Sequence, residues 1–124
     1  AMVVSDPGLD GRIRFWKACN LAWVRRCKKG EALELACLTL KKARLLHLPG
    51  ELFVEYQLNA QKLCPDLFVA TAAYGDYAPG YICTEIAYSQ GGYEASPGAS
   101  TVDPGVEKVM MGAIRKLLDA KAAD

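Results

Sequence analysis

Apolar residues between positions 12 and 28 recur at intervals of three and four, which is the spacing of an amphipathic helix. They are Ile13, Trp16, Trp23, Val24 and Cys27. Gly30 follows this run and is placed to end the helix, because glycine adopts a left-handed C-terminal conformation without strain. The pattern therefore predicts a first helix over residues 12–28.

Two leucine-rich runs follow, over residues 31–40 and 44–48, and only the three residues Lys41-Lys42-Ala43 separate them. A connection this short favours an antiparallel hairpin. Because both faces of the two runs are apolar, we expect other elements to cover the hairpin on each side.

The middle of the chain predicts a second helix and a third strand. Pro49-Gly50 breaks the leucine-rich run, and residues 51–64 then place apolar side chains on one helical face until Pro65 ends it. The next run, over residues 67–73, is short and unbroken, which is typical of a strand buried on both faces rather than an edge strand. It leads into a Gly- and Tyr-rich loop over residues 74–81, and rigid strands commonly present functional residues on such loops.

The last third of the chain predicts two more helices. Thr84 is suited to cap a short helix that extends to Tyr88, with glycines at 91 and 92 to end it and a loop over residues 96–101. Asp103-Pro104 forms a cap and first-residue pair for a final helix. Its expected buried stripe is Val106, Val109, Met110, Ala113, Ile114, Leu117 and Leu118.

This order of elements predicts an α+β fold, a mixed α/β layer in which a β-hairpin and a further strand pack with about three main helices. With 124 residues, 52% of them hydrophobic and 23% charged, the chain suits a single globular domain over residues 12–124. Residues 1–11 carry turn signals without periodicity, which predicts a flexible leading segment.

Charge and hydropathy narrow the expected partners. The net charge of +1 provides no overall field for nucleic acid, so we expect no nucleic-acid partner. No apolar run reaches the ~20 residues of a membrane-spanning helix, and no signal-peptide core is present, so we expect a soluble chain of unknown compartment. Five widely spaced cysteines without a C-x-x-C pair argue against a disulfide framework or a structural zinc site and predict buried free thiols.

The first predicted helix is strongly basic. Together with Lys29, which follows it directly, it holds seven of the fifteen basic residues and no acidic one, beside both tryptophans of the chain. Such a helix could bind lipid headgroups or phosphate. A solvated basic face opposite a Trp-containing core face is the favoured interpretation, since helices commonly sort their side chains in this way. The basic residues are Arg12, Arg14, Lys17, Arg25, Arg26, Lys28 and Lys29.

Few residues carry a recognisable pattern for chemistry. Glu51 is expected in the first turn of a helix, where the macrodipole favours its ionised form by ~0.3–1 kcal/mol, although acidic residues also begin many ordinary helices. His47 is the only histidine and ends a leucine-rich strand, which favours a structural role over a catalytic one. Five of the six tyrosines lie within twenty residues, where phenols could bind a metal, stabilise an oxyanion or simply pack: Tyr74, Tyr77, Tyr81, Tyr88 and Tyr93.

Two runs of residues, in this order, resemble the end of the catalytic domain of neutral/alkaline (non-lysosomal) ceramidases. The resemblance covers roughly residues 31–118 and is closest to uncharacterised bacterial ceramidase-like proteins. The two runs are Leu48-Pro49-Gly50-Glu51 and Gly80-Tyr81-Ile82-Cys83-Thr84-Glu85-Ile86-Ala87-Tyr88-Ser89-Gln90-Gly91-Gly92-Tyr93-Glu94.

The resemblance implies the role of three residues. In that family a P-G-E glutamate and the tyrosine that opens a Y-[IV]-x-T segment bind zinc, together with two histidines from earlier in the chain. The matching residues here are Glu51 and Tyr81. A second family tyrosine, in the Y-E pair that follows, helps to hold the oxygen of the scissile amide, and the matching residue is Tyr93. Such a site would cleave an N-acyl amide of a sphingolipid or related lipid with the help of zinc.

The chain departs from the family pattern in ways that bear on activity. The histidine motifs are missing, and Ser100-Thr101, which match residues that normally follow the Y-E pair directly, are displaced by an insertion. Because a catalytic zinc takes about three protein ligands, we expect the chain alone to be inactive and to bind zinc weakly or not at all. An N-terminal catalytic segment of the same parent chain would supply the missing ligands.

A second hypothesis is a non-catalytic binding module, in which the tyrosine loop and the basic helix hold a lipid or a partner protein. The positions of Glu51 and Tyr81 distinguish the two hypotheses, because shared zinc ligands must lie within roughly 4 Å of each other. If a partner segment is missing, exposed apolar surface could also make the chain a homodimer.

Overall fold

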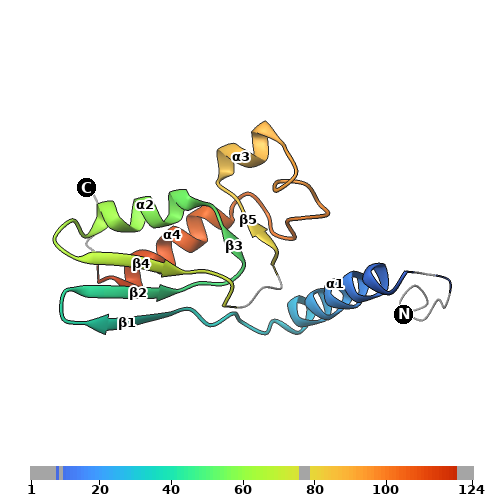
Figure 1. Cartoon of the computed structure of the whole chain (residues 1–124), viewed down its shortest axis with the longest axis horizontal. Helices are drawn as coiled ribbons and strands as arrows, with labels where there is room; N and C mark the ends of the chain where they lie inside the picture. The colour runs from blue at the N-terminus through green and yellow to red at the C-terminus, as the bar shows by residue number, and fades with distance from the viewer. Residues whose placement is uncertain (1–7, 9, 76–78, 120–124) are drawn as a thin grey trace. The chain divides into compact units, whose positions relative to one another are not determined.

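The computed structural model describes residues 8, 10–75 and 79–119 (Figure 1). Contacts between residues divide the chain into two compact units, Ala1–Leu33 and Glu34–Asp124. The sequence places a boundary after residue 11, whereas the contacts divide the chain after Leu33. Most of the predicted leading segment lies outside the described residues.

The first unit contains helix α1, Gly11–Lys29. Asp10 caps its beginning by accepting a hydrogen bond from the Arg12 backbone N–H at 2.8 Å. Gly30 ends it in the left-handed conformation, with φ of 68°, as the sequence predicts. None of the residues of α1 is buried within the first unit, and the expectation that its tryptophan-containing face belongs to a core stays a prediction.

The second unit is built on a three-stranded sheet. Strands β1 (Ala36–Leu40) and β2 (Ala43–His47) form the predicted antiparallel hairpin, and β4 (Phe68–Ala72) pairs with β2 in parallel. Helices α2 (Val54–Leu63) and α4 (Val106–Leu117) lie along this sheet (Figure 1). This architecture confirms the predicted α+β fold.

The core of the second unit lies between one face of the sheet and these two helices. Leu46 of β2 and Val69 of β4 are almost fully buried there. Gln57 of α2 accepts hydrogen bonds from both the backbone and the hydroxyl of Thr71 in β4, at 2.8 and 2.7 Å, and so fixes the helix on the sheet. The other buried apolar side chains of this cluster are Leu48, Tyr56, Ala60, Ile82, Met110, Met111, Ile114 and Leu118.

The opposite face of the sheet stays exposed in the described part of the chain. The side chains of Leu38, Leu40 and Phe68 are 55%, 54% and 67% exposed. Both the predicted cover on each side of the hairpin and the predicted double burial of residues 67–73 are therefore wrong. The reason is that α2 and α4 pack on the same face. Among the strands of the described residues, β4 pairs with β2 alone and forms an edge of the sheet.

A second, two-stranded sheet consists of β3 (Glu51–Leu52) and β5 (Tyr81–Ile82), which run parallel. It corrects the prediction that Glu51 lies in the first turn of a helix, since α2 begins only at Val54. The backbone N–H groups of Glu51 and Phe53 donate to Gly80 O and Ile82 O, at 2.8 and 3.1 Å, so this segment pairs with β5 before the helix begins. The macrodipole argument for Glu51 therefore does not hold.

Helix α3, Glu85–Gln90, begins at the predicted cap, where the Thr84 hydroxyl accepts the Ala87 N–H. Helix α4 starts later than predicted, because Asp103 accepts the Gly105 N–H and Pro104-Gly105 form a turn instead of the first helical residues. Val109 is 69% exposed, so its assignment to the buried stripe is wrong.

All five cysteines are free, as the sequence predicts. Cys83 is buried, Cys37 and Cys64 are half-buried, and Cys19 and Cys27 of α1 are exposed, so the prediction of burial is confirmed for Cys83 alone.

Candidate functional site

Glu51 and Tyr81 are register partners on the neighbouring parallel strands β3 and β5. Neighbouring strands lie about 4.8 Å apart, and the side chains of partner residues extend from the same side of a sheet. The two short strands thus bring a carboxylate and a phenol together from segments that lie far apart in the sequence. Both residues are half-buried.

Gly50 makes this pairing possible. Its φ of 64° lies in the left-handed region, and a Cβ atom on it would lie 2.7 Å from Gly80 O and 2.9 Å from Ile82 Cδ1. The Gly50 carbonyl accepts the Tyr74 N–H at 2.8 Å, and the Glu51 N–H donates to Gly80 O. A side chain at position 50 would push β3 away from β5, so the P-G-E run requires glycine directly before the carboxylate.

A chain of hydrogen bonds fixes β5 from the other side. The Ser100 hydroxyl donates to the Tyr81 carbonyl at 2.8 Å, and the Tyr88 hydroxyl lies 2.7 Å from Ser100 Oγ. Because Ser100 has one hydroxyl hydrogen, Tyr88 is the donor to Ser100. Tyr88 in turn accepts the Cys83 N–H at 3.4 Å. These bonds hold the backbone on both sides of Ile82. They therefore fix the position of the Tyr81 backbone, from which its side chain extends.

Tyr93 lies against the ring of Tyr81. The two ring centroids are 6.1 Å apart with an interplanar angle of 76°, an edge-to-face contact. Tyr93 follows α3 in the chain and is 71% exposed. The structure therefore brings the three predicted site residues together, Glu51 beside Tyr81 and Tyr81 beside Tyr93.

Two groups next to β5, Cys83 and Tyr56, have raised pKa values. Burial raises the pKa of the Cys83 thiol, while its hydrogen bond with Tyr88 acts in the opposite direction. Burial, with the charge of Glu107 adding to it, also raises the pKa of Tyr56. The Tyr56 hydroxyl donates to the Cys83 carbonyl at 3.0 Å, so Tyr56 supports the strand from the core side.

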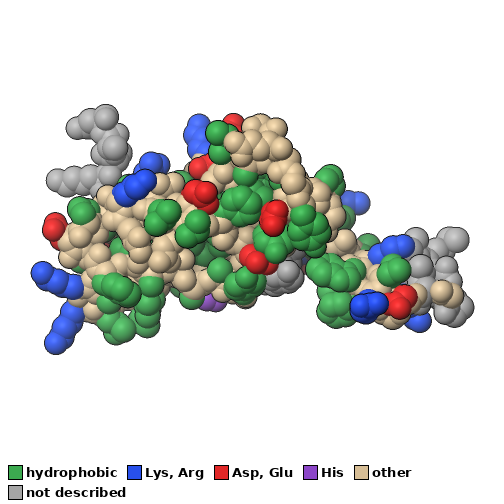
Figure 2. All heavy atoms as spheres, turned by 45° about the horizontal axis from the view of Figure 1, so that its top comes forward, with side chains coloured by type: hydrophobic (Ala, Val, Ile, Leu, Met, Phe, Trp, Pro, Cys, Tyr) green, Lys and Arg blue, Asp and Glu red, His purple; other side chains and the backbone are tan. Residues whose placement is uncertain are grey.

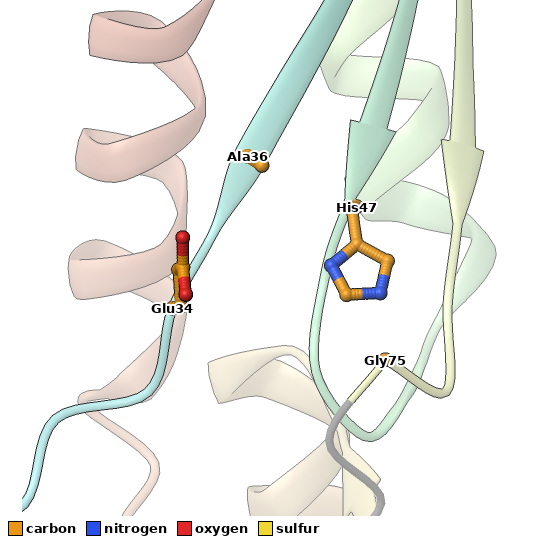
Figure 3. A pocket seen from close by; sticks show the side chains of 4 residues that line it. All are labelled: Glu34, Ala36, His47 and Gly75. Carbon is orange, nitrogen blue, oxygen red and sulfur yellow. The ribbon is translucent and has the colours of Figure 1, made fainter.

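His47, the last residue of β2, lines a different depression of the surface (Figure 3). Its pocket has a volume of about 400 Å³ and is lined by Glu34, Ala36, His47 and Gly75. Figure 3 shows the imidazole ring directed toward Gly75, where a Cβ atom would collide with the ring. None of the three clustered residues lines this pocket, and the structural role expected for His47 stays a prediction.

Of the other tyrosines in this part of the sequence, Tyr74 and Tyr88 lie within the described residues. Tyr74 has a φ of 65°, which is uncommon for a residue with a side chain. The Tyr88 hydroxyl is hydrogen-bonded to Ser100 and in this way helps to hold the backbone of β5. Tyr77 lies outside the described residues. The sequence does not predict the positioning roles of Ser100 and Tyr88. Only the folded structure shows that their hydroxyl groups are hydrogen-bonded to each other.

Metal-binding capacity in the described residues is limited. Within residues 8, 10–75 and 79–119, no group of three or more His, Cys, Asp and Glu side chains is placed to hold a metal ion. The phenol of Tyr81 can bind a metal ion through its oxygen, as the Glu51 carboxylate can, so the two residues offer two candidate metal ligands. Comparison of the chain with protein-family models, with curated proteins and with solved structures finds no match.

Proposed function

We propose that the chain is the C-terminal part of a zinc-dependent amide hydrolase of the ceramidase type, in which Glu51 and Tyr81 bind zinc. The observation that carries the proposal is the register pair of these two residues on β3 and β5. Side chains of register partners extend from the same side of a sheet, which supports a shared ion, for which the two oxygens must lie within about 4 Å of each other.

The donor set fits part of a zinc site. Carboxylate oxygen is an ordinary zinc ligand, and a cation that lowers the pKa of a phenol allows it to bind through oxygen as well. A catalytic zinc takes about three protein ligands and keeps one position open, so further ligands would come from a segment that precedes the chain. Zinc bound there supplies a Lewis acid that polarises the amide carbonyl and lowers the pKa of a water molecule.

Tyr93 is the residue suited to contact the substrate. Its edge-to-face contact with Tyr81, the proposed zinc ligand, and its high exposure to solvent support this role. A phenol O–H directed at the amide oxygen stabilises the negative charge that develops there. The substrate class is an N-acyl amide of a sphingolipid or a related lipid, and that assignment rests on the family resemblance.

The proposal can be tested on the chain itself by titrating zinc and following backbone amide signals by NMR. We expect weak binding, with shifts concentrated around Glu51, Tyr81 and Tyr93, and no hydrolysis of an N-acyl substrate. Glu51→Gln should abolish these shifts. Glu55→Gln, which changes an exposed carboxylate four residues further along the chain, in the first turn of α2, should leave them unchanged.

Two results would contradict the proposal. Zinc-dependent shifts that centre on His47 and Glu34 would place the metal in the other pocket. Tight stoichiometric binding that survives Glu51→Gln would show that the two residues on β3 and β5 are not the ligands. Either result would favour the binding-module hypothesis.

A further inference from the structure

The two units of the chain carry opposite net charges. Residues 1–33 hold seven basic and three acidic residues, a net charge of +4, whereas residues 34–124 hold eight basic and eleven acidic residues, a net charge of −3. The overall charge of +1 hides this difference. An anionic partner would therefore be attracted to the first unit and not to the second.

The positive charge is concentrated on one side of α1. With about 100° between successive helical residues, Arg14, Lys17, Arg25 and Lys28 fall together on one face. Lys17 and Lys28 are both exposed. At the ends of the helix, Arg12 and Lys29 form exposed ion pairs with Asp10 and Glu31, at 3.6 and 3.4 Å. The sequence of α1 itself contains no acidic residue.

An apolar stripe adjoins this basic face. It consists of Ile13, Trp16, Trp23, Val24 and Cys27, the residues whose spacing predicts the helix. Ile13, Trp16 and Val24 are 45%, 52% and 45% exposed. Figure 2 shows hydrophobic and basic side chains next to each other on the surface of this helix.

We propose that α1 lies in the interface of an anionic lipid membrane. In such an arrangement the apolar stripe is buried at the boundary of headgroups and acyl chains, and the lysines and arginines contact the lipid phosphates. Tryptophan is enriched at this boundary because its ring is apolar and its N–H is a hydrogen-bond donor. The helix lies on the membrane and does not cross it, since no described helix is both long and apolar enough to span one.

The combination of charge and tryptophan favours lipid over other anionic partners. Nucleic acid would be held by the basic face alone and would leave the apolar stripe in water. An anionic membrane accommodates both faces of the helix at once. This inference concerns the first unit and does not depend on the zinc site in the second.

Tryptophan fluorescence tests the proposal without a label, because both tryptophans of the chain lie in α1. We expect a blue shift of the emission when the whole chain is mixed with vesicles of phosphatidylserine and phosphatidylcholine. Vesicles of phosphatidylcholine alone should produce little shift. Added salt should weaken the binding, since it screens the attraction between lysine and lipid phosphate.

Two matched double variants distinguish binding through the basic face of α1 from an attraction to which any exposed lysine of the chain contributes. Each lysine near an anionic membrane contributes about a fivefold gain in affinity, so Lys17→Gln with Lys28→Gln should weaken binding about 25-fold. Lys62→Gln with Lys108→Gln removes two exposed helical lysines from the second unit and should have little effect. Circular dichroism checks that the helix content of both variants is unchanged.

Three results would overturn the proposal. The first is an equal blue shift with neutral and anionic vesicles, or none with either. The second is an equal loss of binding in the two double variants. The third is a blue shift that appears without vesicles as the protein concentration rises, because the apolar stripe would then be covered by another copy of the chain.

Discussion

Gly50 and Gly80 are the residues at which no side chain fits beside the candidate zinc ligands. Both have left-handed backbones, with φ of 64° and 68°. A Cβ atom at position 80 would collide with the Ala99 carbonyl, and one at position 50 with the Gly80 carbonyl. Three chain segments therefore meet at backbone distance around Glu51 and Tyr81, which is what holds the two side chains in register.

Replacement of Gly50 by alanine tests this close approach. Gly50→Ala should lower the free energy of unfolding by more than about 1 kcal/mol, because the left-handed backbone and the contact with Gly80 O both oppose a Cβ atom. Urea unfolding measures the change. Gly112→Ala is the control, since a Cβ atom there meets nothing within 4 Å, and we expect it to stabilise α4 by up to about 1 kcal/mol. A similar effect of both substitutions would refute the argument.

Tyr56 gives the fold a predictable response to alkaline pH. Burial, with Glu107 adding to it, raises its pKa above the ordinary value of about 10. The folded state therefore holds a proton that the unfolded state loses first, so stability is fully present below pH ~10 and falls as the pH rises further. Tyr56→Phe should remove this alkaline decline, while Tyr93→Phe should retain it in unfolding curves measured at several pH values.

Substitution of Tyr56 also has a cost at neutral pH. The Tyr56→Phe variant loses the donor to the Cys83 carbonyl, which should lower stability by about 1–3 kcal/mol. If the variant kept the stability of the wild type at neutral pH, the buried hydrogen bond would not stabilise the fold. If it also kept the alkaline decline, Tyr56 would not be the group that causes that decline.

At the scale of elements, β5 depends on hydrogen bonds from outside its own sheet. The Cys83 N–H donates to the Tyr88 hydroxyl, which donates to the Ser100 hydroxyl, which in turn donates to the Tyr81 carbonyl. The Tyr81 N–H donates to Ala99 O at 3.0 Å, so this short strand is held on both sides.

Ser100→Ala should release β5. We expect a loss of about 1–3 kcal/mol, because the substitution leaves buried groups without partners, and faster hydrogen exchange of the amides of residues 81–83. Exchange measured by NMR or mass spectrometry reports both. Ser89→Ala serves as the control, since that hydroxyl makes one exposed bond to Ile86 O and its loss should stay within about 0.5 kcal/mol. Unchanged exchange at 81–83 would show that the hydroxyl chain does not hold the strand.

Elements defined by local signals could be predicted from the sequence. The caps Gly30 and Thr84 and the short hairpin connection act within a few residues of the chain, and the structure has each of them as expected. Strand β3 could not be predicted, because two residues are too few to show a periodicity. Residues 51 and 52 form a strand instead of joining α2 because they pair with β5, which is distant in the sequence. The exposed face of the sheet was missed for a related reason. An apolar run does not indicate how many helices cover it.

The candidate site shows the same division. Glu51, Tyr81 and Tyr93 came from the family resemblance, and the structure brings them together. The independent argument for Glu51, its position at a helix start, is wrong. The supporting roles of Ser100 and Tyr88 could not be read from residue types, since serine and tyrosine occur in many loops and only the fold aligns their hydroxyls.

At the scale of the whole molecule, the sheet face that is exposed in the described part of the second unit makes self-association an expected property. Leu38, Leu40 and Phe68 lie on it, and monomers rarely expose contiguous apolar patches of this kind without a partner. We expect the mass measured by light scattering to rise with concentration. Phe68→Lys should suppress the rise, whereas Val109→Lys, at an exposed apolar residue of α4, should not. A monomer at every concentration would contradict this expectation.

The measurement that most directly tests the shared zinc site uses the protein from the whole reading frame that encodes this chain. The zinc position in its crystals can be located by anomalous scattering. The account predicts one zinc ion with oxygens of Glu51 and Tyr81 at about 2 Å and histidine ligands from a preceding segment. It would be contradicted by zinc bound at His47, or by a reading frame without histidine motifs upstream of the chain.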